Sequence, residues 1–367
     1  MKIAIMTDTP TVKSGYAVMA RGVGKYLLRM GVEIVYIGFQ HVGEPCYIYM
    51  EGKYVKIYQP TLERVLGIEK PNILIHIRDP FVYTPKYYPH PYSIIDAARR
   101  HKCKAVNWVP VNSTDYPRDV VNSLIRESDY ILVFTEWGRN ELLMCGVPYN
   151  IMDVLHPGVD MEIFRPQPPS RSEFNAREDR KLIGFIGVDQ ARKATPLILY
   201  VVSKVIEDID CDLFLLAPLE GVFDLKHHIE VSNMKGRVLT PSIYDATWGW
   251  SSEKMARWYN TLDLYLTLST CEGFNLPILE AASCRTPVVA SNHPVHVEIL
   301  GELGVYVKTS KTLPTTYSLD YIATDLDEAA SKVAETLRRG RLTDTSKLEK
   351  YSLKNTAEKL LKMCDSI

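Results

Sequence analysis

LYLTLSTCEGFNLPILEAA, residues 264–282, places an apolar run, a short polar loop and a helix-like segment in immediate succession. We expect a buried strand over Leu264 to Leu268, because continuous apolar runs of this length suit strands covered on both faces. Pro277 favours the first turn of a helix, where a missing N–H costs nothing. Gly273 lets the loop backbone approach a ligand closely. The stretch therefore predicts the strand–loop–helix unit of an α/β protein with a parallel sheet.

The same alternation of apolar runs and helix-like segments extends along the whole chain. It predicts parallel sheets with right-handed crossovers, which bind ligands beyond the carboxyl ends of their strands. In the first half, strands are expected over Ile3 to Met6, Glu33 to Gly38, Ile73 to Ile77, Ala105 to Val109, Tyr130 to Phe134 and Met152 to Leu155. In the second half, they are expected over Leu182 to Gly187, Cys211 to Ala217, Leu264 to Leu268, Pro287 to Ala290 and Val305 to Lys308.

The length of 367 residues fits two domains rather than one. A polar, proline-bearing stretch at residues 167–173 is typical of a linker and marks the expected boundary. The prediction is thus an α/β protein with two Rossmann-like domains facing each other across a cleft, over residues 1–166 and 174–345. Residues 346–367 are expected to hold a C-terminal helix, over about Lys347 to Met363, and its packing back across the domains stays open.

Charge and cysteine content limit the classes of partner and compartment. The formal net charge of −1 argues against a general nucleic-acid binder, which needs an excess of Lys and Arg. The seven cysteines are odd in number and scattered, with no CxxC spacing, which indicates reduced thiols. The sequence shows no signal-peptide pattern and no apolar stretch long enough to span a bilayer. We therefore expect a cytoplasmic protein.

Two carboxylates flank the expected start of the helix in the opening stretch. The free N–H groups and the dipole of a helix N-terminus attract anions such as phosphate. Glu272 and Glu280 would repel phosphate, but they accept hydrogen bonds from hydroxyl groups well. Sugar or ribose hydroxyls are therefore their expected partners. The alternative is an ordinary helix start at which the dipole favours acidic residues.

The paired glutamates carry a resemblance to a known family. Seven residues separate Glu272 from Glu280, with Gly-Phe after the first and Pro277 before the second. This arrangement resembles the paired-glutamate motif of retaining glycosyltransferases of the GT-B fold, family 4, also called glycosyltransferase group 1. Residues 286–291, TPVVAS, resemble the next strand of that family, and residues 182–187 with the following Arg-Lys pair resemble the first strand of its donor domain and its basic pair.

The resemblance covers nearly the whole chain and implies a reaction. A sugar would pass from a nucleotide-diphosphate sugar to a hydroxyl acceptor with retention of configuration, and no metal or other cofactor is expected. The first domain would lie on the acceptor side, and the second would hold the donor. A glycan, a lipid or a protein could supply the hydroxyl, and peripheral contact with a membrane stays open, whereas nucleic acid is not an expected partner.

The resemblance also implies a role for each matching residue. Glu280 would hold the donor ribose, Glu272 would contact the sugar hydroxyls, and amides of the Gly-Phe-Asn turn would hold sugar or phosphate. Positioned cations stabilise a departing diphosphate without a metal, although an Arg-Lys pair in a loop is often only a solvated surface. The expected catalytic residues are Glu272, Arg192 and Lys193, and the expected donor-binding residues are Gly15, Gly273, Phe274, Asn275, Leu276 and Glu280.

Gly15 enters this set through the loop after the first strand. The run from Met6 to Tyr16 resembles the glycine-containing first loop of the family, which would pass close to the donor phosphates. A plain strand-to-helix turn, leading into a helix over about Tyr16 to Met30, is the alternative. Residues 156–160 and 164–166 resemble the interdomain signature of the family, for which we expect a structural role.

The sequence departs from the family pattern in two places. Many relatives place a histidine after a mid-domain strand, but residues 108–115 contain none. Asn112 and Asp115 are the candidates for contact with the sugar or acceptor there. Arg285 stands where relatives usually carry glycine, which we expect to alter a turn rather than the chemistry.

Two further clusters and two rival functions remain. His293, His296 and Glu298 could suggest a metal, but packing or donor contact at a helix start is the preferred interpretation. The aromatic and proline-rich residues 81–92 would suit an acceptor, a membrane interface or a stiff structural loop. The rival functions are a nucleotide-sugar epimerase of the same fold and a non-catalytic nucleotide-sugar-binding protein.

Overall fold

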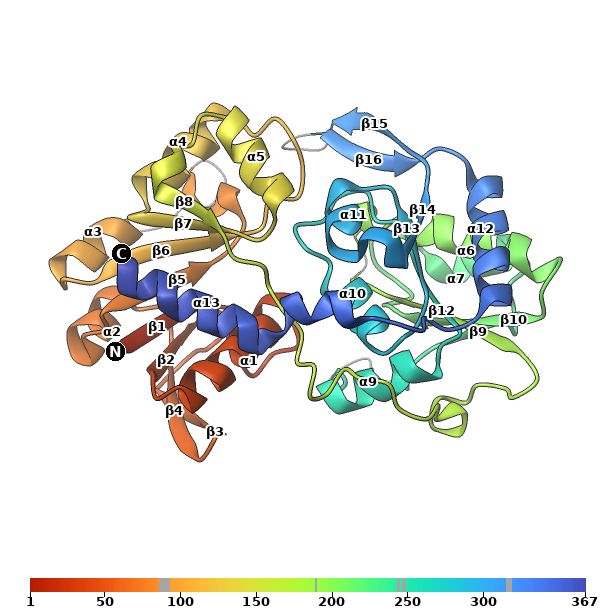
Figure 1. The fold of residues 1–367 in the computed structure, drawn as a ribbon, viewed down its shortest axis with the longest axis horizontal. Coiled ribbons are helices and arrows are strands. Elements are labelled where there is room, and N and C mark those ends of the chain that lie inside the picture. The colour runs from red at the N-terminus through yellow and green to blue at the C-terminus, as the bar shows by residue number, and fades with distance from the viewer. Residues whose placement is uncertain (86–92, 189, 243–244, 246–248, 315–318) are drawn as a thin grey trace. The chain divides into compact units, whose positions relative to one another are not determined.

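The computed structural model describes residues 1–85, 93–188, 190–242, 245, 249–314 and 319–367 (Figure 1). The chain divides into two compact units, Met1–Asp160 with Tyr351–Ile367, and Met161–Lys350. Each unit is built on its own sheet of mainly parallel strands that alternate with helices. This arrangement confirms the α/β class and the two Rossmann-like units predicted from the alternating pattern.

The sheet of the first unit has the order β3-β4-β2-β1-β5-β6-β7-β8. All of its neighbouring pairs are parallel except β3 with β4. From β1 the chain first builds outward through β2 and then returns to the other side with β5, so the topological switch point lies between β1 and β5. The strands are β1 Lys2–Thr7, β2 Glu33–Gly38, β3 Cys46–Met50, β4 Lys53–Tyr58, β5 Ile73–Ile77, β6 Lys104–Val109, β7 Tyr130–Val133 and β8 Met152–Val154.

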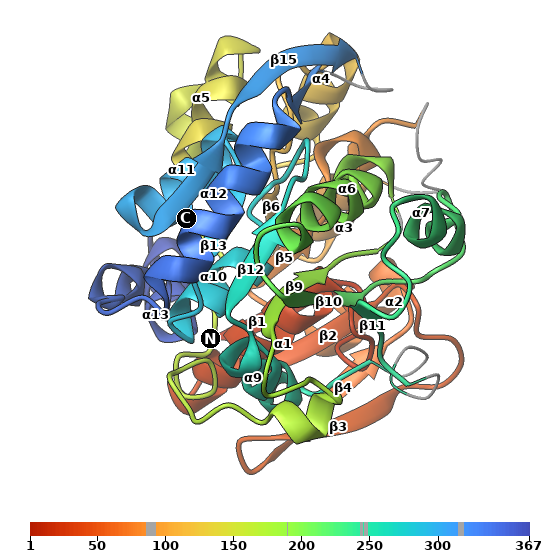
Figure 2. The same cartoon turned by 90° about the vertical axis from the view of Figure 1, so that its right-hand side faces the viewer.

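The sheet of the second unit has the order β11-β10-β9-β12-β13-β14, with every pair parallel. Its switch point lies between β9 and β12 by the same reasoning. Helices α6 and α12 lie side by side over this sheet (Figure 2). The strands are β9 Lys181–Ile186, β10 Cys211–Leu216, β11 Val238–Leu239, β12 Leu264–Thr267, β13 Val288–Ser291 and β14 Gly304–Val307, and an antiparallel pair adds β15 Thr309–Pro314 and β16 Leu319–Ala323.

Every strand predicted from an apolar run is present, with ends that agree to within one residue. These strands are buried along most of their length, which explains why continuous apolar runs revealed them. Between the strands lie α1 Gly15–Arg29, α2 Leu62–Glu69, α3 Ile94–Arg100, α4 Arg118–Arg126, α5 Glu136–Met144, α6 Thr195–Ile206, α7 Leu225–Val231, α9 Ser252–Thr261, α10 Leu276–Ser283, α11 Pro294–Leu300, α12 Leu326–Arg339 and α13 Leu353–Ser366.

The hairpin β3–β4 was not predicted from the sequence. Its two-residue turn has positive φ at both positions, 48° at Glu51 and 76° at Gly52, as type I′ hairpin turns require. In β3 the tyrosines at 47 and 49 are exposed, while Ile48 between them is partly buried. The pattern is therefore alternating rather than continuous, and a search for apolar runs passes over it.

The polar stretch after Pro166 belongs wholly to the second unit. Arg171 Nη2 lies 2.6 Å from Asp263 Oδ2, and the backbone N–H of Gln167 donates to Asn260 Oδ1 at 2.8 Å. The ring of Phe174 is buried beside the rings of Phe214 and Trp250. The chain leaves the first unit after Asp160 and returns to it after Lys350.

The two segments at which the chain crosses between the units are hydrogen-bonded to each other within the first unit. The N–H of Val159 donates to the carbonyl of Tyr351 at 3.0 Å, and the N–H of Leu353 donates to the carbonyl of Val159 at 2.9 Å. A Cβ added to Gly158 would lie 2.5 Å from the Tyr351 carbonyl oxygen, so only glycine fits there. This contact gives the segment 156–160 a packing role.

The C-terminal helix α13 begins at Leu353 and packs along α1 in the first unit (Figure 1). The sequence prediction began this helix at Lys347, but residues Ser346–Tyr351 form a 3-10 turn. Ser352 sets the start because its side chain accepts a hydrogen bond from the N–H of Asn355. Across the described residues, no helix is both long enough and apolar enough to cross a membrane.

Candidate active site

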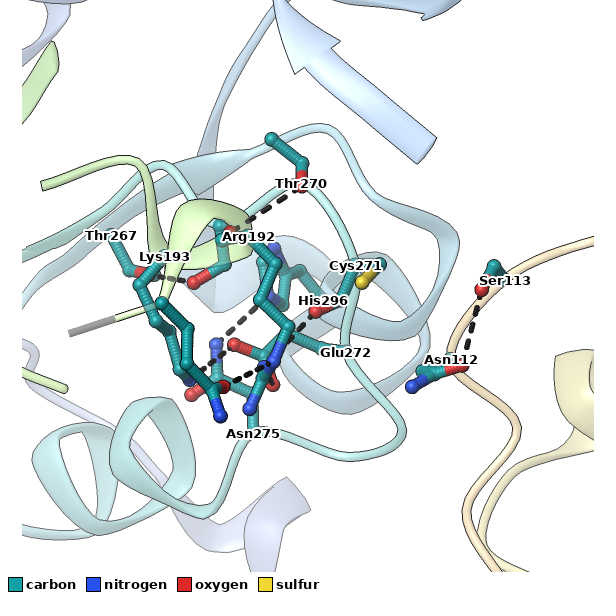
Figure 3. A network of polar contacts seen from close by, with 12 residues as sticks. Asn112, Ser113, Arg192, Lys193, Thr267, Thr270, Cys271, Glu272, Asn275 and His296 are labelled. Atoms are coloured by element: carbon teal, nitrogen blue, oxygen red, sulfur yellow. Dashed lines mark hydrogen bonds and ion pairs between the residues drawn. The ribbon is translucent and has the colours of Figure 1, made fainter. Parts of the chain in front are cut away.

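The residues that follow β9 and β12 meet at the switch point of the second sheet (Figure 3). The 3-10 turn Ala191–Lys193 follows β9, and the loop 268–275 follows β12. The N–H of Thr270 donates to the carbonyl of Arg192 at 2.7 Å, so one loop is fixed to the other. Because β9 and β12 are neighbours, residues about 80 positions apart in the sequence share one small region.

Glu272 lies between the two cations of this region. Its Oε1 is 2.5 Å from Lys193 Nζ, and its Oε2 is 3.0 Å from Arg192 Nη1. Burial favours the neutral carboxyl, but the charges of Lys193 and Arg192 outweigh it and hold the pKa of Glu272 well below its usual range. Glu272 is therefore ionised at any physiological pH. The structure brings together the three residues expected to be catalytic.

The two cations differ in their surroundings. Lys193 is buried, and this burial lowers its pKa, although Glu272 favours its charged form. Arg192 is one-third exposed and also donates to the carbonyl of Cys271 and to the side chain of Gln190. Two cations and one carboxylate leave one excess positive charge. The cluster is therefore suited to a polyanion rather than to a neutral ligand.

The start of α10 lies directly after Glu272. Asn275 precedes the helix in the left-handed conformation, with φ 66° and ψ 65°, and its side chain does not cap the helix. Leu276 is the first helical residue, the second is Pro277, which has no N–H, and the N–H of Ile278 donates to the carbonyl of Asn275 at 3.2 Å. The N–H of Leu276, with Gly273 and the buried Phe274 before it, lies at the positive end of the helix dipole, where the sequence predicts an anion site.

His296 on α11 supports this turn from behind (Figure 3). Its Nδ1 donates to the carbonyl of Ser291 at 2.9 Å, and its Nε2 accepts from Asn275 Nδ2 at 2.9 Å. Both ring nitrogens are thus engaged in a neutral ring, and burial lowers the pKa of His296. Nearby His293 accepts from the N–H of Val295 and caps α11. Both histidines fit the helix-start interpretation better than the metal interpretation.

Glu280 projects from the second turn of α10. The hydroxyl of Tyr259, a fully buried residue of α9, donates to Glu280 Oε2 at 2.9 Å. Burial raises the pKa of Glu280 to about 7, against which the Tyr259 hydrogen bond acts. Glu280 is therefore close to half-protonated at neutral pH, in contrast to the permanently ionised Glu272.

In the first unit, Gly15 is the first residue of α1. A Cβ added to it would meet no atom within 4 Å, so nothing in the described part of the chain requires glycine for packing there. Ser14 caps the helix by accepting from the N–H of Ala17 at 3.1 Å. The structure thus makes Gly15 an open position at the start of a helix, which fits both interpretations of the loop.

Asn112 and Asp115 follow β6 in the first unit. Asn112 Oδ1 accepts from the hydroxyl of Tyr116 at 2.7 Å and from Ser113 Oγ at 3.1 Å. Asp115 is exposed and left-handed, with φ 58°. Asn112 is therefore held in place, while Asp115 faces solvent. Of the aromatic stretch 81–92, residues 86–92 lie outside the described residues.

A polar cluster at the switch point of the first sheet was missed in the sequence. Asp8 follows β1 and Arg78 follows β5, with Arg78 Nη2 2.5 Å from Asp8 Oδ1. Gln40, after β2, donates to the same carboxylate at 2.6 Å, and Ser14 donates to its other oxygen at 2.5 Å. The Arg78 guanidinium lies 4.3 Å from the centre of the Phe39 ring. The available signal was the position of charged residues directly after buried strands.

The residues of this site lie in a segment whose sequence matches a known protein family. Residues 180–317 match the sequence model of the family described as Glycosyl transferases group 1. We call this matched segment, which makes up most of the second unit, the group 1 domain. The matched segment contains both glutamates and both cations of the site, so the group 1 domain confirms the resemblance drawn from the motif.

Curated relatives are named as glycosyltransferases. A D-inositol 3-phosphate glycosyltransferase of Mycobacterium marinum is 28% identical over 62% of this chain and 48% of its own length. One from Paenarthrobacter aurescens is 32% identical over 40% of this chain and 36% of its own. The chain thus spans about half or less of the length of these two relatives.

Solved structures extend the likeness to the whole fold. The Anabaena protein Alr3699/HepE in complex with UDP matches with a TM-score of 0.68 at 12% identity, with full coverage of both chains. A sucrose-phosphate synthase from Thermosynechococcus elongatus matches with a TM-score of 0.72 at 12% identity, over all of this chain and 98% of its own. At these identities the likeness establishes the GT-B fold around the group 1 domain.

Proposed function

We propose that this protein is a metal-independent, retaining glycosyltransferase that moves a sugar from a nucleotide-diphosphate sugar to a hydroxyl acceptor. The observation that carries the proposal is the cluster of Lys193, Glu272 and Arg192 beside the start of α10. The names of the curated relatives support the reaction class. The Anabaena protein with the same fold is described in complex with UDP and with UDP-glucose, which supports a nucleotide sugar as the donor.

The diphosphate of the donor would lie against the cations and the helix start. As the bond between sugar and phosphate breaks, negative charge develops on the departing oxygen. Lys193 and Arg192 would stabilise this charge, and so would the positive end of the α10 dipole. Their positions are fixed before the donor arrives, because Glu272 and the backbone of loop 268–275 already hold them.

The two glutamates would divide the recognition of the donor. Glu280 has one oxygen bound by Tyr259, which leaves its other oxygen to accept from ribose hydroxyls. Glu272 is ionised and would accept from hydroxyls of the transferred sugar. A carboxylate with so low a pKa is a weak base, so we assign Glu272 to binding and orientation rather than to proton transfer.

Transfer with retention can then proceed on one face of the sugar. The bond from the anomeric carbon to the phosphate oxygen breaks, and the bond to the acceptor oxygen forms on the same side. The acceptor proton passes to the departing phosphate oxygen, so the atoms and charges balance without a protein base. The acceptor would lie at the first unit, where Asp8, Arg78 and Asn112 lie in the loops that follow β1, β5 and β6.

The experiment is product analysis with a purified donor and a set of polyol, sugar and lipid acceptors. We expect a glycoside whose anomeric configuration, read from proton NMR, equals that of the donor, formed in the presence of EDTA. An inverted product would contradict the retaining mechanism, and dependence on added metal would contradict metal independence. An isomerised donor without transfer would indicate an epimerase, and binding without turnover a non-catalytic protein.

A further inference from the structure

The turn before α10 has an unusual backbone for its residue type. Asn275 adopts the left-handed conformation, which glycine enters freely and which side chains make costly. Asparagine tolerates this conformation better than most residues, usually through a local hydrogen bond of its side chain. Here the side-chain amide reaches instead to His296, 21 positions further along the chain. The conformation of the turn is thus tied to a neighbouring helix.

His296 is well built for this contact. It is fully buried, and its Nδ1 is fixed by the carbonyl of Ser291 at the end of β13. Ser291 in turn donates from Oγ to the carbonyl of Ser269 at 2.6 Å, which joins the end of β13 to the loop after β12. The neutral ring, with its proton on Nδ1, offers Nε2 as an acceptor to the Asn275 amide N–H. The strand end therefore supports the turn through a chain of hydrogen bonds.

We propose that His296 is a positioning residue of the donor site: by anchoring Asn275 in the left-handed conformation, it fixes the direction of the N–H groups at the start of α10. This inference rests on the proposed function, because those groups would receive the donor. His296 itself would not touch the donor, since its Nε2 faces the side-chain amide of Asn275. The effects of substitutions at 275 and 296 on nucleotide binding should therefore depend on each other.

A double-mutant cycle tests the coupling. His296→Leu removes the acceptor, and we expect it to weaken nucleotide binding about fivefold, the value of one hydrogen bond of ordinary strength. Asn275→Gly supplies a backbone that needs no anchor, so in that background His296→Leu should change the dissociation constant less than twofold. His296→Gln keeps an acceptor oxygen and should lie closer to the wild type. Binding of UDP, GDP and ADP is measured by calorimetry, with circular dichroism as the check on folding.

The outcomes separate this inference from the proposed function. If His296→Leu lowers nucleotide affinity equally in the wild-type and Asn275→Gly backgrounds, or in neither, the positioning role is overturned. Nucleotide binding by the wild type would still uphold the donor site. Failure of the wild type to bind any nucleotide would overturn both. If His296→Leu does not fold, the comparison of His296→Gln with Asn275→Ala decides, because only the second removes the anchored side chain. A positioning role then requires that Asn275→Ala bind more weakly than His296→Gln.

Discussion

At the scale of single residues, the two glutamates of one motif differ in charge state because their neighbours differ. Glu272 touches two cations, whereas the side chain bound to Glu280 is the neutral Tyr259. The pKa of the first carboxyl is accordingly far below its usual range, and that of the second is raised to about 7. The sequence places the two residues eight positions apart but holds no sign of this difference, which arises from residues of other elements.

Lys193→Ala should reduce kcat/KM about 100-fold or more, because a preorganised charge next to the leaving group is lost. Arg192 would remain beside Glu272, so the buried carboxylate keeps one partner. The matched control is Lys204→Ala on α6, which removes the same charge from a surface pair with Glu207. Steady-state rates of all three proteins check this. Equal activity of Lys193→Ala and the control would remove Lys193 from the mechanism.

Donor binding should weaken as the pH falls through about 7. The ionised form of Glu280 accepts ribose hydroxyls, and its raised pKa leaves less of that form below neutrality. Tyr259→Phe removes the hydrogen bond that lowers this pKa, so the midpoint should move to higher pH. Nucleotide affinity measured from pH 5.5 to 8.5 checks both statements. A flat profile in the wild type, or a midpoint that moves downward in Tyr259→Phe, would contradict the role of Glu280.

The candidate residues could be predicted where a sequence motif held them. Glu272, Glu280 and the turn between them stand in one stretch of sequence, and Arg192 and Lys193 follow residues 182–187. The resemblance of both stretches to family motifs indicated a site. Tyr259, His296 and Asp8 were not assigned to the site, because each acts through a contact that folding creates. Spacing along the chain carries no information about such contacts.

At the scale of elements, the strands formed by apolar runs were predictable, whereas the hairpins and the short edge strand β11 were not. Strands buried on both faces leave continuous apolar runs, and the structure has every one of them. Strand β3 alternates exposed and partly buried residues, and α13 begins later than its sequence pattern because Ser352 caps it. Element ends depend on such caps and turns rather than on the apolar pattern.

Arg285 ends α10 and shows how a departure from the family pattern costs stability. It adopts the left-handed conformation, with φ 59°, at a position where glycine is the preferred helix terminator. Arg285→Gly should therefore stabilise the protein by about 1 kcal/mol. Arg285→Ala is the control, since it removes the charge but keeps a Cβ. Urea unfolding monitored by circular dichroism checks this, and equal stability of the two variants would show that the backbone is not the cause.

At the scale of the whole molecule, each unit gathers polar residues at the switch point of its own sheet. In the second unit these are Arg192, Lys193 and Glu272, and in the first they are Asp8 and Arg78. The fold class followed from the alternation of strands and helices, because that alternation leaves few arrangements open. The acceptor could not be named, because a fold does not determine the substrate.

The most direct test of the central claim is a thermal-shift panel of UDP, GDP and ADP sugars without added metal, with Glu280→Ala beside the wild type. We predict that one class of nucleotide sugar raises the melting temperature of the wild type and that the variant loses this shift. A wild type that no nucleotide sugar stabilises would contradict the donor site, and so would a shift that the variant retains in full.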